Sequence, residues 1–251
     1  MEAYTDFAGV YDIFMDETPY EEWFLFLKER LAEAGIENGL LLELGCGTGT
    51  MTQLFEDAGY DMIGVDNSIE MLEEANRKKI ADNRQILYLL QDMQEFELYG
   101  TVRAVISVCD SINYLTEPEA LVQCFKLVNN YLDPKGLFFF DFNTVHKYRD
   151  IIGDAVIAEN RDTCSFIWEN GYDGESRINE YDLTLFIKEE DSSLYHKYVE
   201  THYQRGYELD EIKRYLEKAG LVFVAAYDDY TKEPAHPDSE RILVIARENG
   251  K

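Results

Sequence analysis

Apolar and polar residues follow two different rhythms along this chain. Up to about residue 142, short apolar runs typical of buried strands alternate with segments whose apolar residues recur every three to four positions, the period of a helix. Strands that alternate with helices predict right-handed βαβ units and a mostly parallel sheet. The predicted strands cover residues 40–44, 62–65, 86–90, 102–108 and 137–142.

Helices are expected before and between these strands. Residues 5–36 carry an apolar stripe that includes Trp23 and Leu31, and Gly35 supplies a helix stop. A capping box at Thr116–Glu119, with Pro118 early in the helix, predicts another helix start. Residues 133–136, Asp-Pro-Lys-Gly, predict a turn before the fifth strand.

The second rhythm begins near residue 155 and is rich in β-forming residues. Three antiparallel strands are predicted at 163–169, 178–188 and 195–205, joined by turns at 170–174 and 189–193. A helix around Ile212 and Leu216 follows, and two strands at 221–227 and 241–246 end the chain without a helix between them.

These patterns predict an α/β fold with a Rossmann-like, seven-stranded, mostly parallel sheet whose last strand is antiparallel. Residues 1–150 and 206–251 would form the core, with the main strands within 38–142. Residues 151–205 would form a small antiparallel β insertion that acts as a lid.

The first strand leads directly into a glycine-rich turn. Glu43 lies near the end of this strand, and Gly45, Gly47 and Gly49 follow before a helix begins. Strand, glycine turn and helix bring the backbone close to a nucleotide-like ligand. Glycine has no Cβ, so ligand atoms can approach the main chain there.

The spacing and charge of this turn indicate which ligand it suits. Dinucleotide sites favour G-x-G-x-x-G, whereas this turn reads G-x-G-x-G with Thr50 in the sixth position. No Lys or Arg lies between Ala32 and Arg77, although helix N–H groups alone can hold a pyrophosphate. The Glu43 carboxylate favours a ligand with an ammonium group over one with phosphates.

The stretch from Glu43 to Gly49 resembles the first motif of the class I S-adenosylmethionine-dependent methyltransferases. Asp66 follows the second strand, 21 residues after Gly45, where nucleotide folds place the carboxylate that binds ribose hydroxyls. The resemblance implies that Asp92 receives the adenine amino group and that the Met93 backbone meets the ring. The fourth strand departs from the family, since it begins Val-Arg where Phe-Asp is usual. The implied cofactor-binding residues are Tyr11, Glu43, Gly45, Cys46, Gly47, Gly49, Asp66, Asn67, Asp92, Met93 and Cys109.

Looser motifs extend the resemblance over nearly the whole chain. Residues 7–12, 109–115 and 202–207 resemble a subgroup of small bacterial methyltransferases of mostly unassigned substrate, in which a β-rich insertion caps the site. No catalytic residue is assigned, and the candidates are Asp110, Tyr114, His202 and Arg205. Trp168, His202 and Arg205 of the insertion are proposed for testing as contacts of the methyl acceptor, although a buried strand position suits His202 better.

Charge and cysteine usage narrow the function. The 23 basic and 50 acidic residues give a net charge of −27, which repels nucleic-acid phosphates. The four cysteines show no C-x-x-C spacing and no metal-ligand cluster with the four histidines, so no metal is expected and a reducing, cytoplasmic location is predicted. No apolar run approaches the roughly 18 residues of a membrane helix.

The sequence therefore predicts an S-adenosylmethionine-dependent methyltransferase that acts, as a monomer or homodimer, on a small molecule. An RNA or protein methyltransferase with a local basic groove remains an alternative, as does a non-catalytic cofactor-binding protein or a nicotinamide enzyme on the same fold. The chain contains no Asp/Asn-Pro-Pro-Tyr sequence and no Pro-Cys pair, which disfavours base methylation of the DNA-enzyme types.

Overall fold

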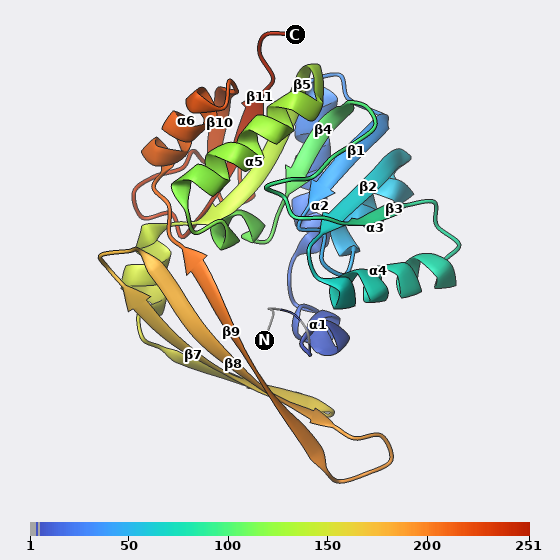
Figure 1. Ribbon diagram of the computed structural model, residues 1–251, viewed down its shortest axis with the longest axis vertical. Coiled ribbons are helices and arrows are strands. Elements are labelled where there is room, and N and C mark those ends of the chain that lie inside the picture. The colour runs from blue at the N-terminus through green and yellow to red at the C-terminus, as the bar shows by residue number, and fades with distance from the viewer. Residues whose placement is uncertain (1–3, 5) are drawn as a thin grey trace.

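A seven-stranded sheet forms the centre of the computed structural model, which describes residues 4 and 6–251 (Figure 1). Its strands are β1 (Gly39–Leu44), β2 (Tyr60–Asp66), β3 (Leu87–Leu90), β4 (Val102–Ser107), β5 (Leu132–Asn143), β10 (Val222–Asp228) and β11 (Arg241–Arg247). They lie in the order β10-β11-β5-β4-β1-β2-β3. β1 to β5 are parallel, and the last strand, β11, runs antiparallel to both β5 and β10. The predicted fold class is confirmed.

Helices cover both faces of this sheet. They are α1 (Ala8–Phe14), α2 (Tyr20–Glu33), α3 (Thr50–Asp57), α4 (Ile69–Ala81), α5 (Pro118–Tyr131) and α6 (Leu209–Lys218). Phe138 and Phe140 of β5 pack in the core that α5 and α6 share, whereas Phe139 packs in the core beneath α2 and α3. Successive strand residues point to opposite faces, so the middle of a strand covered on both sides is apolar at successive positions, as β5 is from Leu137 to Phe140.

A second, separate sheet follows the fifth strand. It contains β6 (Val156–Asn160), β7 (Cys164–Asp173), β8 (Ile178–Lys188) and β9 (Tyr195–Arg205), paired antiparallel in this order. In Figure 1 its long strands extend away from the main sheet. Phe166, Leu183 and Leu185 on its inner face pack against Val10 and Phe14 of α1. The small antiparallel β sheet was predicted, and its first strand, β6, was not.

Three local predictions are wrong. Glu117 is the N-cap of α5 and no side chain caps the helix, so the Thr116–Glu119 capping box does not form. β5 already begins at Leu132, so residues 133–136 belong to this strand and do not form a separate turn. The pairing of β5 with β4 shifts in register there, from Leu132 opposite Val102 to Leu137 opposite Ala104. β7 continues to Asp173, which pairs with Ile178, so this hairpin turns at residues 174–177.

Two further points concern the helices. A short π-helix, η2 (Lys147–Ile152), follows β5 and was not predicted. The predicted helical region 5–36 contains α1 and α2, while its residue 5 lies outside the described residues. Within the described part of the chain, no helix is long and apolar enough to cross a membrane.

Candidate functional site

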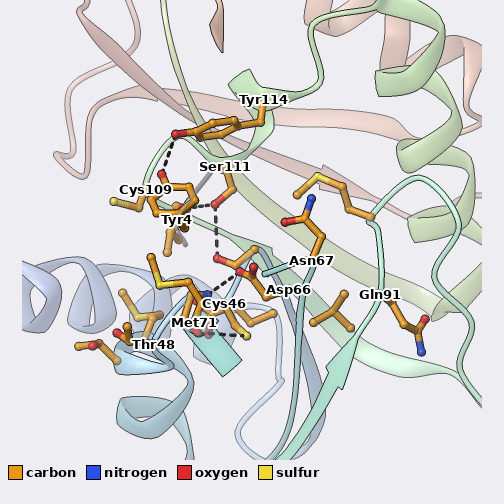
Figure 2. Close-up of a pocket in the computed structure, with 18 of the residues that line it drawn as sticks. Tyr4, Cys46, Thr48, Asp66, Asn67, Met71, Gln91, Cys109, Ser111 and Tyr114 are labelled. Carbon is orange, nitrogen blue, oxygen red and sulfur yellow. Dashed lines mark hydrogen bonds between the residues drawn. The ribbon is translucent and has the colours of Figure 1, made fainter. Parts of the chain in front are cut away.

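A cavity lies at the carboxyl ends of β1, β2 and β4, where the glycine turn begins α3 (Figure 2). In a parallel sheet these ends meet at one edge, the usual place for a ligand. Ten of the eleven residues predicted to bind the cofactor line this cavity, namely Tyr11, Glu43, Gly45, Cys46, Gly47, Asp66, Asn67, Asp92, Met93 and Cys109. Gly49 does not line it and instead faces the ring of Tyr88 on β3.

The glycine turn brings bare backbone to the cavity wall. Gly45 and Gly47 have φ values of 70° and 52°, a region where a Cβ causes strain. A Cβ on Gly45 would come within 2.5 Å of the Ser111 hydroxyl oxygen. A Cβ on Gly47 would meet no atom within 4 Å, so the space beside this backbone is open to a ligand.

Asp66 joins the end of β2 to this turn. Its Oδ2 accepts a 2.7 Å hydrogen bond from the Gly47 N–H, and its Oδ1 accepts a 2.9 Å bond from the Ser68 N–H. Burial raises the pKa of Asp66, and the backbone N–H groups act against that shift. The carboxylate therefore has a fixed orientation beside the cavity before any ligand binds.

Glu43 is buried at the end of β1 and accepts a hydrogen bond from the Thr52 hydroxyl. Burial raises the pKa of Glu43 to about 8, and the nearby Asp66 adds to the increase. The carboxyl is therefore mostly protonated at neutral pH in the unliganded protein. A cation bound beside it would favour its ionised form.

The loop after β3 closes the other end of the cavity. Asp92 Oδ1 accepts a 2.7 Å hydrogen bond from the Gln94 N–H, which fixes the turn that carries Met93. Gln91, Asp92 and Met93 all line the cavity, and Asn67 approaches from the end of β2 (Figure 2). The candidate ribose contact, Asp66, therefore lies at the end of β2, and the candidate adenine contacts, Asp92 and Met93, lie just after the neighbouring strand β3.

A second cavity of about 560 Å³ adjoins the first. Tyr4, Tyr11 and Cys109 line both cavities, so the two spaces meet at these side chains. The walls of the second cavity come from α1, η2, the loop after β4 and the inner face of the small sheet. Its apolar and aromatic residues include Phe14, Phe166, Trp168, Tyr181 and Leu183, and its polar residues include Asp110, Lys147, Gln204 and Arg241.

Asp141 at the end of β5 holds the turn between the two cavities. Cys109 and Asp110 have φ values of 58° and 51°, and their backbone N–H groups donate to the Asp141 carboxylate at 3.0 and 2.6 Å. Arg241 donates to Asp141 Oδ2 at 2.9 Å and to Asp110 Oδ1 at 3.0 Å. Gln204 donates to Asp110 Oδ2 at 2.7 Å, so both oxygens of this cavity-lining carboxylate are already bonded.

The four candidate catalytic residues occupy different positions. Asp110 lines the second cavity and Tyr114, at the end of η1 (Ser111–Tyr114), lines the first. His202 is buried behind Tyr114, with its Nδ1 3.0 Å from the tyrosine hydroxyl. Arg205 lines neither cavity: its guanidinium is 3.4 Å from the Thr116 carbonyl oxygen and lies over the Tyr207 ring.

Several residues that line the second cavity were not predicted from the sequence. Tyr181 and Gln204 point inward because they share the two-residue alternation of Leu183 and His202 on β8 and β9, and that period could have revealed them. Lys147 lies on a π-helix and Arg241 opens the last strand, and neither carries a local signal. No group of three or more His, Cys, Asp or Glu residues within positions 4 and 6–251 is arranged to hold a metal ion.

Comparison with known proteins agrees with this geometry. The family described as a methyltransferase domain matches residues 41–136. A putative methyltransferase of Geobacillus sp. strain WCH70 is 32% identical over 246 residues, covering 98% of this chain and 99% of that protein. An S-adenosylmethionine-dependent methyltransferase from Clostridium acetobutylicum, known from its crystal structure, has a TM-score of 0.89 at 26% identity over 99% of this chain and 100% of its own. The chain belongs to the S-adenosylmethionine-dependent methyltransferases, and S-adenosylmethionine is its cofactor.

Two similar proteins whose names describe a substrate are less similar to this chain, in coverage or in identity. The dTDP-3-amino-3,4,6-trideoxy-alpha-D-glucopyranose N,N-dimethyltransferase of Streptomyces venezuelae is 31% identical over 135 residues, 53% of this chain and 55% of that protein. An amino pentose methyltransferase from Micromonospora echinaspora, solved with S-adenosylmethionine bound, has a TM-score of 0.75 at 15% identity over 99% of both chains. The second likeness shows the shared fold alone.

Proposed function

We propose that this methyltransferase acts on a small molecule bound in the second cavity. The observation that carries the proposal is the shared boundary of the two cavities at Tyr4, Tyr11 and Cys109. A methyl donor in the first cavity and an acceptor in the second would face each other there. The cofactor supplies the activated methyl group, so the protein must mainly align the two reactants and exclude water.

The size and setting of the second cavity support a small acceptor. Its volume of about 560 Å³ falls within the range of small-molecule sites, roughly 300–1,000 Å³. The net charge of −27 further disfavours an RNA substrate, because proteins attract phosphates with basic patches. A protein substrate would have to insert one side chain or a terminus into this space.

The lining indicates an acceptor with an apolar part and a polar part. Phe166, Trp168 and Leu183 offer apolar surface, whereas Lys147 and Asp110 offer a cation and a carboxylate. The Arg241 guanidinium is already paired with Asp110 and Asp141, so Lys147 is the cation that the described lining residues leave available to a ligand. The amine acceptor in the name of the Streptomyces venezuelae relative is compatible with such a site.

The small sheet, within residues 151–205, is proposed to be the lid over the acceptor. β6, β7, β8 and β9 all contribute residues to the second cavity, whereas no residue of these strands lines the first. The core formed by 1–150 and 206–251 would bind the cofactor. In this arrangement Glu43 pairs with the cofactor's ammonium group, Asp66 accepts its ribose hydroxyls, and Asp92 with Met93 holds the adenine.

Location and assembly are also proposals. The four cysteines are free thiols in the structure, which supports a reducing compartment and hence the cytoplasm of a bacterial cell. The enzyme is proposed to work as a monomer or homodimer.

Methyl-labelled cofactor can test the proposed acceptor class. The protein is incubated with labelled S-adenosylmethionine and a cell extract separated into small molecules, protein and RNA. Label should enter the small-molecule fraction, and transfer should fall strongly in Leu183→Trp, which fills the second cavity without touching the first. Label found in RNA or protein, with Leu183→Trp as active as the unmodified enzyme, would contradict the proposal.

A further inference from the structure

A chain of hydrogen-bonding side chains leads away from the place where the two cavities meet. The Tyr4 and Tyr114 hydroxyl oxygens are 2.7 Å apart (Figure 2), and those of Tyr114 and Tyr181 are 2.8 Å apart. The Tyr114 hydroxyl also lies 3.0 Å from His202 Nδ1. On the far side of the ring, His202 Nε2 is 3.3 Å from Glu200 Oε2.

This row of side chains begins at the cavities, and its other end is buried away from water. Tyr4 lines both cavities, Tyr114 lines the first and Tyr181 lines the second. The side chains of His202 and Glu200 have no exposed surface. A histidine with a buried carboxylate behind it and a hydroxyl in front of it is the arrangement by which enzymes orient and stabilise a proton acceptor.

Glu200 is held as a carboxylate by the N-terminal segment. It accepts hydrogen bonds from the backbone N–H groups of Tyr4 at 2.8 Å, Asp6 at 2.6 Å and Phe7 at 3.0 Å. Burial acts to raise the pKa of Glu200, but His202 and these N–H groups outweigh it and the pKa is lowered. The same bonds place the Tyr4 side chain against Tyr114.

Glu200 Oε2 lies 3.3 Å from His202 Nε2, a charge contact that is not aligned as a hydrogen bond among the described residues. The negative charge of Glu200 favours a proton on Nε2, which leaves Nδ1 as an acceptor. Tyr114 must then donate to Nδ1, and its two lone pairs accept from Tyr4 and Tyr181. Burial raises the pKa of Tyr4 and Tyr114 well above the usual tyrosine value, so both hydroxyls stay neutral and can pass a proton on.

We propose that Tyr4, Tyr114 and His202 form a proton relay that deprotonates the methyl acceptor, which is therefore an N–H or O–H nucleophile. This inference rests on the proposed binding of the acceptor in the second cavity. Tyr4 is the catalytic residue, because it faces both cavities. Tyr114, His202 and Glu200 act through it as positioning residues.

The proposed step balances in atoms and charge. The acceptor's lone pair forms a bond to the methyl carbon, and the carbon–sulfur bond breaks with its electron pair going to sulfur. The acceptor's proton passes to the Tyr4 oxygen, the Tyr4 proton passes to Tyr114, and the Tyr114 proton passes to His202 Nδ1. The positive charge that leaves the sulfonium thus appears on an imidazolium that faces the Glu200 carboxylate.

The resting direction of the relay can be tested without any acceptor. Protein labelled with ¹⁵N-histidine should show, by long-range ¹H–¹⁵N correlation, that His202 is the Nε2–H tautomer, with its signals assigned by their loss in His202→Gln. In Tyr114→Phe the His202 Nδ1 signal should move, because its hydrogen bond is lost. An Nδ1–H tautomer, or a doubly protonated ring at pH 7, would overturn the relay whether or not the proposed acceptor site is right.

Kinetics test the relay itself, with the labelled acceptor fraction as substrate. His202→Gln and Tyr114→Phe should lower kcat by about 100-fold or more, the usual range for loss of general acid–base catalysis. Their Kd for S-adenosylmethionine should stay within about threefold, which a collapse of the cofactor site would not allow. Tyr203→Phe, next to His202 on the exposed side of β9, is the matched control and should keep full activity. Unchanged kcat in His202→Gln would overturn the relay, and no transfer by the unmodified enzyme would count against the proposed acceptor site alone.

Discussion

The backbone N–H of Gly47 donates a 2.7 Å hydrogen bond to Asp66 Oδ2. This contact links the turn after β1 to the end of β2, two segments that both line the first cavity. The second oxygen of Asp66 is bonded to Ser68, whose hydroxyl caps α4 by accepting from the Met71 N–H at 3.2 Å. One carboxylate therefore sets the position of the glycine turn, the end of β2 and the start of α4.

Asp66→Ala should weaken the binding of S-adenosylmethionine at least about tenfold. Charge-assisted hydrogen bonds to ribose hydroxyls contribute roughly 1.5–3 kcal/mol each, and about 1.4 kcal/mol is a factor of ten in affinity. Calorimetric titration measures the change. Asp61→Ala removes an exposed carboxylate from the same strand and should leave the affinity unaltered. A folded Asp66→Ala protein with the original Kd would exclude Asp66 from the cofactor site.

Gly47→Ala should separate backbone strain from ligand contact. Gly47 and Gly59 both have positive φ, 52° and 93°, and a Cβ at either position would meet no protein atom within 4 Å. Alanine at either position should lower the free energy of unfolding by about 1–2 kcal/mol, the strain of a left-handed residue. Only Gly47 lines the cavity, so only Gly47→Ala should also weaken cofactor binding. Equal cofactor affinities in the two variants would mean that the ligand does not approach Gly47.

Local patterns were enough to predict the main sheet and ten of the residues that line its first cavity. Apolar runs, glycines and acidic residues at strand ends are all read from short segments, so Glu43, Asp66 and Asp92 could be placed at one sheet edge before the structure was known. The strand β6 was missed because it is a short edge strand with mostly exposed residues, which leaves no alternation to detect.

The second cavity could not be predicted because long-range contacts build it. Asp110, Gln204 and Arg241 are far apart in the sequence and meet only when β9 and β11 are in place. Glu200 was not recognised either, since its partners are backbone N–H groups of the N-terminal segment nearly 200 residues earlier. Arg205 was chosen because it belongs to the insertion that was expected to cap the site, yet its side chain lies against Thr116 and Tyr207.

Glu43 should make stability depend on pH between about 4.5 and 8. Burial raises the pKa of Glu43 from 4.5 to about 8, so in this range the folded protein holds a proton that the unfolded chain has lost. The stability that this group provides is complete below pH 4.5 and is lost as the pH rises through 8. Relative to Glu43→Gln, the free energy of unfolding should fall by up to roughly 1.4 kcal/mol per pH unit. Parallel pH profiles of the two proteins in urea would show that Glu43 ionises normally.

Cofactor binding at pH 7 should release a proton from Glu43. An ammonium group beside the carboxyl favours its charged form, so binding should lower the pKa of Glu43 from about 8. The heat of binding should therefore change with the ionisation enthalpy of the buffer, by close to one proton per cofactor. Glu43→Gln should bind more weakly and show no such dependence. If the unmodified protein also binds with no proton release, the ammonium group lies elsewhere.

Lys147→Met should stabilise the protein and weaken acceptor binding at the same time. The ammonium group of Lys147 donates to Asn143 Oδ1 at 3.0 Å and, within the described part of the chain, forms no ion pair with a carboxylate. Burial lowers the pKa of Lys147, and the nearby Arg241 adds to the decrease. Methionine has a similar length and no charge, so the free energy of unfolding should rise by about 1 kcal/mol at neutral pH.

The two effects of Lys147→Met have separate measurements. Because the lysine pKa is lowered in the folded protein, the gain in stability should shrink as the pH rises towards 10.5, where the unfolded lysine also loses its proton. The KM for the acceptor should increase about tenfold or more, since a ligand would lose a charge-assisted hydrogen bond, while cofactor affinity stays within a few fold. Lys126→Met, on the exposed side of α5, controls for the loss of a surface charge. A stabilised Lys147→Met enzyme with an unchanged KM would show that the acceptor's polar group binds away from η2.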